Sequence, residues 1–143
     1  MTAMTTEEVA ALGAGLLDEV ERAQLHQEVG EVLEALYGDE AGEIAPQLAR
    51  HFAEAGVVDK AILYLGRAGE AALVSAAYPE AVTHFDAALE LLGATPAGAA
   101  RDAAEIDLRL ALAGALSGVE GFGGTRLGAA YQRATELSRA VGD

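Results

Sequence analysis

Three histidines are the side chains of this sequence best suited to metal or proton chemistry. His26, His51 and His84 fall in three separate helical segments. None has a histidine partner four residues away, which a metal site on a single helix requires. Their spacing does not decide whether they meet in space. We expect three partly exposed histidines on helix surfaces, and we predict no metal-binding or catalytic role for them.

A glycine-rich segment and the many carboxylates are the other candidates for chemistry. Segment 118–125 has the glycine spacing of a phosphate-binding loop, but Gly124 stands where the lysine belongs, and a helical pattern precedes it instead of a strand. No carboxylate interrupts an apolar stripe, as a general acid with a raised pKa would require. Asp102, Glu105 and Asp107 suit the start of a helix. The sequence therefore predicts no catalytic, cofactor-binding or metal-binding residue.

Composition and charge exclude several classes of protein. The 143 residues carry 9 basic and 23 acidic side chains, giving a net charge of −14 that repels nucleic-acid phosphates. The chain has no cysteine, which excludes disulfides, thiolate nucleophiles and cysteine-ligated zinc. No apolar run reaches the roughly 18 residues of a membrane span, and residues 1–6 do not resemble a signal peptide. We expect a cytoplasmic protein that binds neither nucleic acid directly nor a membrane.

The composition is typical of an all-α protein, because alanine, leucine and glutamate are strong helix formers and β-branched residues are sparse. A capping box at Thr5 begins a first short helix, which we expect to end near Leu17. The apolar residues from Val9 to Leu36 do not keep a strict heptad, so docking onto adjacent helices is favoured over a coiled coil. Apolar spacing and helix-ending glycines predict further helices over 18–37, 44–55, 58–76, 79–92, 100–116 and 127–141.

Small residues at regular spacing predict close contacts between these helices. A triplet of alanine, large apolar residue and alanine occurs at Ala61, Leu65 and Ala68, and it recurs from Ala81 to Ala88. An alanine lets two helices approach, while the bulky residue one turn later fills the gap between them. Glycines inside predicted helices, each costing about 1 kcal/mol relative to alanine, indicate close crossings as well. These glycines are Gly30, Gly66, Gly69 and Gly114.

The run LARHFAEAGVVDKAILYLGRAGEAALVSAAYPEAVTHFDAALELL, residues 48–92, resembles tetratricopeptide repeats. It is similar in particular to the helical region after the ATPase domain of bacterial AAA-type adenylate cyclases and LuxR-like transcriptional regulators. The resemblance extends over residues 20–143. It implies antiparallel helical hairpins stacked as a right-handed α-solenoid of about six or seven helices. Residues 18–143 would form one such domain, and residues 1–17 a short N-terminal helix or tail.

The pattern departs from a regular repeat of this family. The first triplet starts at Ala61 and the second at Ala81, which is much closer than the period of about 34 residues in a regular repeat. Segment 118–124 lengthens the last turn, and the chain has no tryptophan, which often begins such repeats. Either the helix over 58–76 closes one pair and opens the next, or the repeats are degenerate.

The resemblance implies a non-catalytic protein-interaction or regulatory scaffold, part of a larger bacterial signalling or transcriptional regulator. Its partner would be a protein, a peptide or a neighbouring domain of the parent chain, and exposed repeat ends could support a homodimer. Arg50, Glu54 and Glu70 stand beside the packing residues. We predict that these three side chains make the polar contacts of the binding groove.

A small-molecule sensor is the alternative function. It would hold its ligand in an apolar pocket between helices near Phe52, Tyr64, Tyr78 and Phe85, and ligand binding would raise the melting temperature. An enzyme fits least well, because the sequence contains no nucleophile–base pair, metal-ligand set or nucleotide-binding loop.

Overall fold

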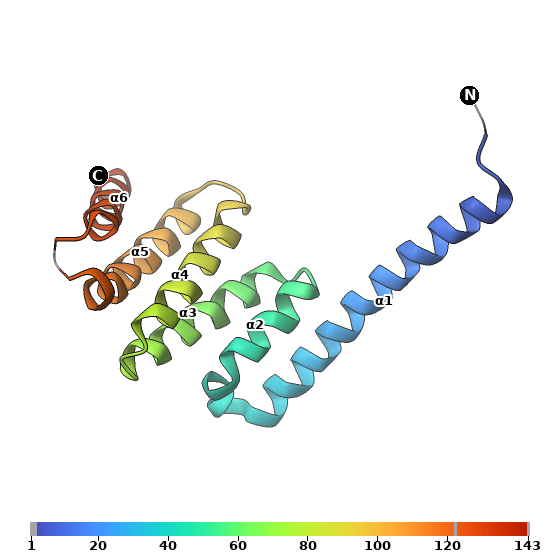
Figure 1. Cartoon of the computed structure of the whole chain (residues 1–143), viewed down its shortest axis with the longest axis horizontal. Coiled ribbons are helices and arrows are strands. Elements are labelled where there is room, and N and C mark those ends of the chain that lie inside the picture. Colours follow the sequence, from blue (N-terminus) through green and yellow to red (C-terminus); the bar gives the residue numbers. More distant parts are fainter. Residues whose placement is uncertain (1–2, 122, 143) are drawn as a thin grey trace.

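The computed structural model describes residues 3–121 and 123–142, which form helices and no strand. The all-α class predicted from composition is therefore confirmed. The helices, shown in Figure 1, are α1 (Thr6–Tyr37), the 3-10 helix η1 (Gly38–Ile44), α2 (Ala45–Glu54), α3 (Val58–Val74), α4 (Tyr78–Gly93), α5 (Ala99–Glu120) and α6 (Thr125–Gly142).

The helices pack mainly against their neighbours in the chain. Contacts run from α1 to α2, from α2 to α3, and onward to α6, so that the helices follow one another in space as they do in sequence (Figure 1). The short connections 55–57 and 75–77 reverse the direction of the chain between consecutive helices. Within the part of the chain that the structure describes, α2 and α4 both pack on α3 and make no close backbone contact with each other.

Helix α1 begins with the expected capping box and is longer than expected. The Glu8 amide donates to Thr5 Oγ1 at 3.1 Å, and the Thr5 amide donates to Glu8 Oε2 at 2.8 Å. The predicted end near Leu17 is wrong, because α1 continues through Gly13 and Gly15 to Tyr37. The two interior glycines cost about 2 kcal/mol relative to alanine, while the alanines, leucines and glutamates around them are among the strongest helix formers. The helix ends at Gly38, which has a φ of +50°.

Two phenylalanine rings lie directly on helix glycines. A Cβ atom added at Gly30 of α1 would lie 2.9 Å from Cζ of Phe52, and one added at Gly69 of α3 would lie 2.5 Å from Cε1 of Phe85. No larger residue fits either position unless the ring moves. The expected close crossings are thus confirmed at these two glycines. The same explanation is wrong for Gly114, where an added Cβ would meet nothing within 4 Å.

Buried alanines and aromatic rings form two core clusters that meet at α3. All four triplet alanines are at most 4% exposed, which confirms them as packing residues. Leu65 packs against both clusters. The N-terminal core cluster contains Ala41, Ala45, Leu48, Ala49, Phe52, Ala61, Tyr64 and Ala68. The C-terminal core cluster contains Ala81, Phe85, Ala88, Leu92, Leu108, Leu112, Ala113, Ala115, Leu116, Leu127 and Ala130.

The spacing between the two alanine triplets is also the spacing between two matching loops. After α2, the amides of Gly56 and Val57 donate to the carbonyls of Ala53 and Phe52. After α3, the amides of residues 76 and 77 donate in the same way to the carbonyls of residues 73 and 72. Both loops are Schellman turns, whose central residue adopts a positive φ. That residue is Gly56 in the first loop, with φ +76°, and Ala76 in the second, with φ +58°.

Helix α5 extends farther than its sequence pattern predicts. It ends at Glu120 rather than at residue 116, so the expected turn over 118–124 is shorter than predicted. Residue 122 of that turn lies outside the residues that the structure describes. Gly118 lies inside α5 beneath the ring of Tyr78, and an added Cβ there would overlap that ring. This glycine therefore makes room for a neighbouring aromatic side chain and does not end the helix.

Replacing Gly69 by alanine should destabilise the protein by about 1–3 kcal/mol, the usual cost of overpacking a core. The matched variant Gly114→Ala should be neutral or stabilising by up to about 1 kcal/mol, because the new methyl group meets open space in a helix. Urea unfolding followed by far-UV circular dichroism measures both free energies. Equal effects of the two substitutions would contradict the role given to Phe85.

Replacing Ala76 by glycine should raise the free energy of unfolding by about 1 kcal/mol. Glycine removes the cost of a left-handed conformation for a residue with a Cβ atom, although it increases the entropy of the unfolded chain. The reciprocal substitution Gly56→Ala should lower the free energy of unfolding, because residue 56 has the same backbone conformation. Thermal unfolding of the two variants beside the wild type tests this pair.

Candidate binding surfaces

A groove between α2 and α4 combines an apolar floor with a polar rim. Small side chains on both helices leave this space, and Leu65 of α3 closes it from below. We call it the α2–α4 groove; its volume is about 430 Å³. Its lining residues are Pro46, Ala49, Arg50, Ala53, Leu65, His84, Ala87, Glu90 and Leu91.

The rim of the α2–α4 groove carries a cation, an imidazole and a carboxylate. Arg50 and Glu90 are exposed, and His84 is half-buried. Arg50 makes no ion pair within residues 3–121 and 123–142, so its guanidinium can bind an incoming carboxylate bidentately. The lining thus combines apolar side chains with charged ones. Bond-making chemistry would need a nucleophile next to a base, which these lining residues do not supply.

The three predicted groove residues do not form one site. Arg50 lines the α2–α4 groove, whereas Glu70 lines a separate cavity of about 590 Å³ between η1 and α3. Glu54 is exposed at the last residue of α2 and lines neither space. The reason is the short period of one helix and one loop. Glu70 lies one helix and one loop beyond Arg50, on α3. The face of α3 that carries Glu70 lines the cavity beside η1 and not the α2–α4 groove.

Glu90, like His84, is a rim residue that sequence reasoning missed. It follows Arg50 by two periods of the helix-and-loop unit, and both residues line the same groove. Alternate helices thus present equivalent positions on one surface. Counting twice the spacing of the alanine triplets onward from Arg50 would have identified Glu90 from the sequence alone.

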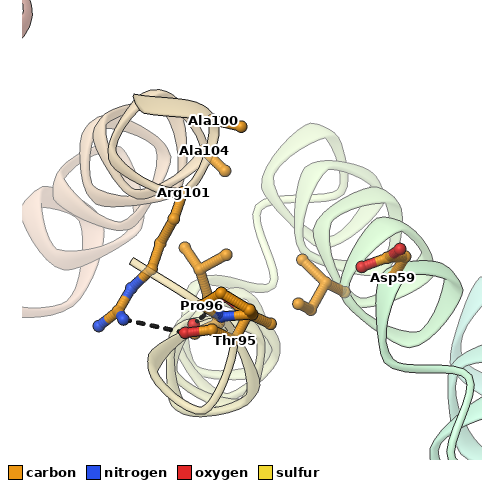
Figure 2. A pocket seen from close by; sticks show the side chains of 8 residues that line it. Asp59, Thr95, Pro96, Ala100, Arg101 and Ala104 are labelled. Atoms are coloured by element: carbon orange, nitrogen blue, oxygen red, sulfur yellow. Dashed lines mark hydrogen bonds between the residues drawn. The ribbon is translucent and has the colours of Figure 1, made fainter. Parts of the chain in front are cut away.

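A smaller cavity lies where the loop 94–98 meets α3 and α5. Figure 2 shows Arg101 of α5 reaching the loop, where its Nη1 donates to the Thr95 carbonyl at 3.0 Å. Asp59 of α3 lies on the opposite side of this space, which has a volume of about 320 Å³. The Arg101 bond fixes the loop against the following helix. The guanidinium therefore has a structural partner here, whereas that of Arg50 has none among the described residues.

The four rings expected around a small-molecule pocket fill space instead of enclosing it. Phe52, Tyr64 and Phe85 are at most 3% exposed and belong to the two core clusters. The rings of Phe52 and Tyr64 stack with centroids 5.9 Å apart. Tyr78 packs on Gly118. A ligand among these side chains would have to displace core residues.

A polar cluster attaches α1 to α3. Lys60 Nζ lies 2.7 Å from Glu34 Oε1, and the Tyr64 hydroxyl donates to Glu34 Oε2. Burial raises the pKa of Glu34, but the hydrogen bonds from Lys60 and Tyr64 and the charges of Lys60 and Arg67 together outweigh burial and hold the pKa below its usual value. Burial and the bond to Glu34 raise the pKa of Tyr64 to about 12. The cluster therefore contains an ionised carboxylate and a neutral phenol at physiological pH.

Glu105 is a buried carboxylate that the sequence analysis misplaced. It is 7% exposed on α5, where Arg109 Nε and Arg133 Nε lie 3.1 Å and 2.9 Å from its Oε2. Burial raises its pKa, and the hydrogen bonds and charges of the two arginines together lower it by more, so the pKa lies below its usual value. The expected role as a helix-start charge fits Asp102, which is in the first turn of α5, but not Glu105. Glu105 instead joins α5 to α6.

Two of the three histidines meet at the contact between α1 and α2. His26 Nδ1 and His51 Nδ1 are 3.0 Å apart, so one ring nitrogen must donate and the other accept. Burial lowers the pKa of His51, and the charges of His26 and Arg50 lower it further. All three histidines are half-buried, as expected, but the contact between His26 and His51 was not anticipated. Among the described residues, no three metal-ligating side chains come together.

Comparison with family models, with curated proteins and with solved structures finds no significant match for this chain. The structure itself adds one further finding. No helix in residues 3–121 and 123–142 combines the length and the apolar character needed to cross a membrane.

Acidification should weaken the attachment of α1 through the histidine pair. Because the folded-state pKa of His51 lies below its unfolded value of about 6.5, its contribution to stability is present above that pH and is lost as the pH falls through the folded pKa. His51→Gln should remove this loss between pH 7.5 and 5.5, a range that contains the reference pKa of histidine and of no other side chain. Urea unfolding of both proteins at both pH values measures the difference.

The matched variant His84→Gln should keep the wild-type response to pH, because His84 lies in the α2–α4 groove and away from the α1–α2 contact. If His51→Gln and wild type lost stability equally on acidification, the pair would have no part in the pH dependence.

Proposed function

We propose that this chain is a non-catalytic protein-interaction module, built as a tetratricopeptide-like right-handed stack of helical hairpins, that binds a segment of a partner protein in the α2–α4 groove. The observation that carries the proposal is the placement of Arg50 and Glu90 on one rim by two helices that both pack on α3. A groove already formed in the unbound protein costs little conformational entropy when a partner binds.

The groove favours a partner segment whose acidic, apolar and basic side chains come in a particular order. Its floor of alanines with Leu65 and Leu91 accepts apolar side chains of moderate size. Arg50 would pair with a carboxylate of the segment, and Glu90 with a cation farther along it. Such charge pairs set the register of the segment and its rate of association more than its total affinity.

The sequence resemblance supports a place for this module in a larger bacterial signalling or transcriptional regulator in the cytoplasm. There the bound segment would belong to another protein or to a neighbouring domain of the parent chain. The nearest-neighbour packing of the helices supports the same proposal, since stacked helical repeats contact mainly their neighbours.

Charge reversal at Arg50 should weaken binding of peptides that use the groove. A phage-displayed library of random peptides would be selected on the wild-type protein, and the enriched peptides would be synthesised and measured by fluorescence anisotropy. We expect Arg50→Glu to weaken binding at least about tenfold, because it removes one charge pair and adds a like charge. The matched control Arg139→Glu changes an exposed arginine on α6, outside the groove, and should leave affinity unchanged.

Circular dichroism would establish that both variants remain folded. Ala87→Arg, which fills the groove with a long side chain, should abolish binding of the same peptides. Peptides that bind wild type, Arg50→Glu and Ala87→Arg equally well would remove the groove as the binding surface.

A further inference from the structure

The N-terminal half of α1 is a helix without a covering element. Every side chain described from residue 6 to residue 22 is exposed, and Figure 1 shows this part of α1 extending away from the other helices. Its exposed apolar side chains include Val9, Leu12 and Val20, which are 54–57% exposed. A single helix of this length is only marginally stable in water, because most of the stability of helices in proteins comes from packing of one face against other elements.

These apolar residues continue the face with which α1 packs on the rest of the protein. In the C-terminal half, His26 meets His51 of α2, and Gly30 lies beneath Phe52. Counted from position 30 toward the N-terminus, successive steps of 7, 3, 8 and 3 residues lead to residues 23, 20, 12 and 9. Each of these steps ends near the same side of a helix. One continuous face is therefore covered by α2 at one end and open at the other.

Charge decides what kind of helix or groove fits the open end. Residues 6–22 carry five carboxylates and one arginine, and Glu8 and Glu19 directly precede Val9 and Val20 at the edge of the apolar face. Glu8 also lines a hollow there with Met4, Ala11 and Leu12. A second copy of α1 would bring another row of carboxylates against this one, which is unfavourable at close range. A surface with lysines or arginines beside its apolar residues would complement it.

We propose that the exposed face of α1, formed by Val9, Leu12 and Val20 and edged by Glu8 and Glu19, docks onto a basic amphipathic helix of another protein. The partner helix extends the packing that α2 provides at the other end of α1. This surface is distinct from the α2–α4 groove and independent of it. A partner could therefore occupy each of them at the same time.

A designed peptide tests this surface without knowledge of the natural partner. The probe is a labelled amphipathic helix of about five turns, with leucine on one face and lysine on the other, and its match carries glutamate in place of lysine. We expect the lysine peptide to bind wild type, with affinity falling as salt is added, and to protect the amides of residues 6–22 from hydrogen exchange. Leu12→Ser/Val20→Ser should weaken binding at least about tenfold.

Matched controls come from the same helix. Leu25 and Val32 are as exposed as Leu12 but lie on a different face of α1, so Leu25→Ser/Val32→Ser should retain the wild-type affinity. If the serine variants lost helix content, Glu19→Lys and Glu28→Lys would replace them, because lysine preserves helix propensity. Only Glu19 borders the face, so only Glu19→Lys should weaken binding of the lysine peptide. Arg50→Glu should leave this binding unchanged, which separates it from the groove proposal.

Three outcomes would overturn the proposal. Equal losses from the two serine pairs would show that the peptide does not recognise this face. Equal binding of the glutamate peptide would remove the charge argument. A wild-type dimer in sedimentation experiments that Leu12→Ser/Val20→Ser dissociates would identify a second copy as the occupant.

Discussion

The structure depends on phenylalanine rings that lie on glycines of neighbouring helices. Phe52 on Gly30 holds α1 against α2, and Phe85 on Gly69 holds α4 against α3. Each buried phenylalanine contributes about 1.5–3 kcal/mol through removal of its surface from water, and it can lie so close to a helix backbone only where no Cβ intervenes. These two contacts set how closely α1 approaches α2 and how closely α4 approaches α3, and with that the positions of the side chains on these helices.

The alternation of helix faces follows from this packing. Because α3 packs on α2 with one side and on α4 with another, it separates these helices, and small residues between them leave the groove open. One helix and one loop separate the two matching Schellman turns that follow α2 and α3. Surface residues that belong together are therefore two units apart in the sequence.

Local patterns predicted much of the fold. The capping box at Thr5, the helix ends at Gly38 and Gly56, and the buried alanines of α3 and α4 all follow from residue types and spacing. Glycine was the ambiguous residue, because Gly13 and Gly15 could end a helix or continue one, and only the rest of α1 decides. Gly118 looked like part of a turn because its reason, the ring of Tyr78, belongs to a different helix.

The candidate site was less predictable, since it depends on contacts between distant segments. Arg50 was identified because it adjoins packing residues, but that criterion does not distinguish the two sides of the helical layer, and Glu70 was grouped with it for the same reason. The burial of Glu105 depends on Arg133 of the next helix, and the His26–His51 contact joins residues 25 positions apart. Neither arrangement has a signature within one helix.

The attachment of α1 gives this helix the mechanics of a lever arm. Its anchor is the short stretch that holds His26, Gly30 and Glu34, and about 36 Å of helix separates Gly30 from the N-terminal turn at 1.5 Å per residue. A tilt of about 10° at the anchor displaces the far tip by about 6 Å over this length. Small rearrangements beside Phe52, which is two residues from Arg50 on α2, would therefore be amplified into large movements of the N-terminal end of α1.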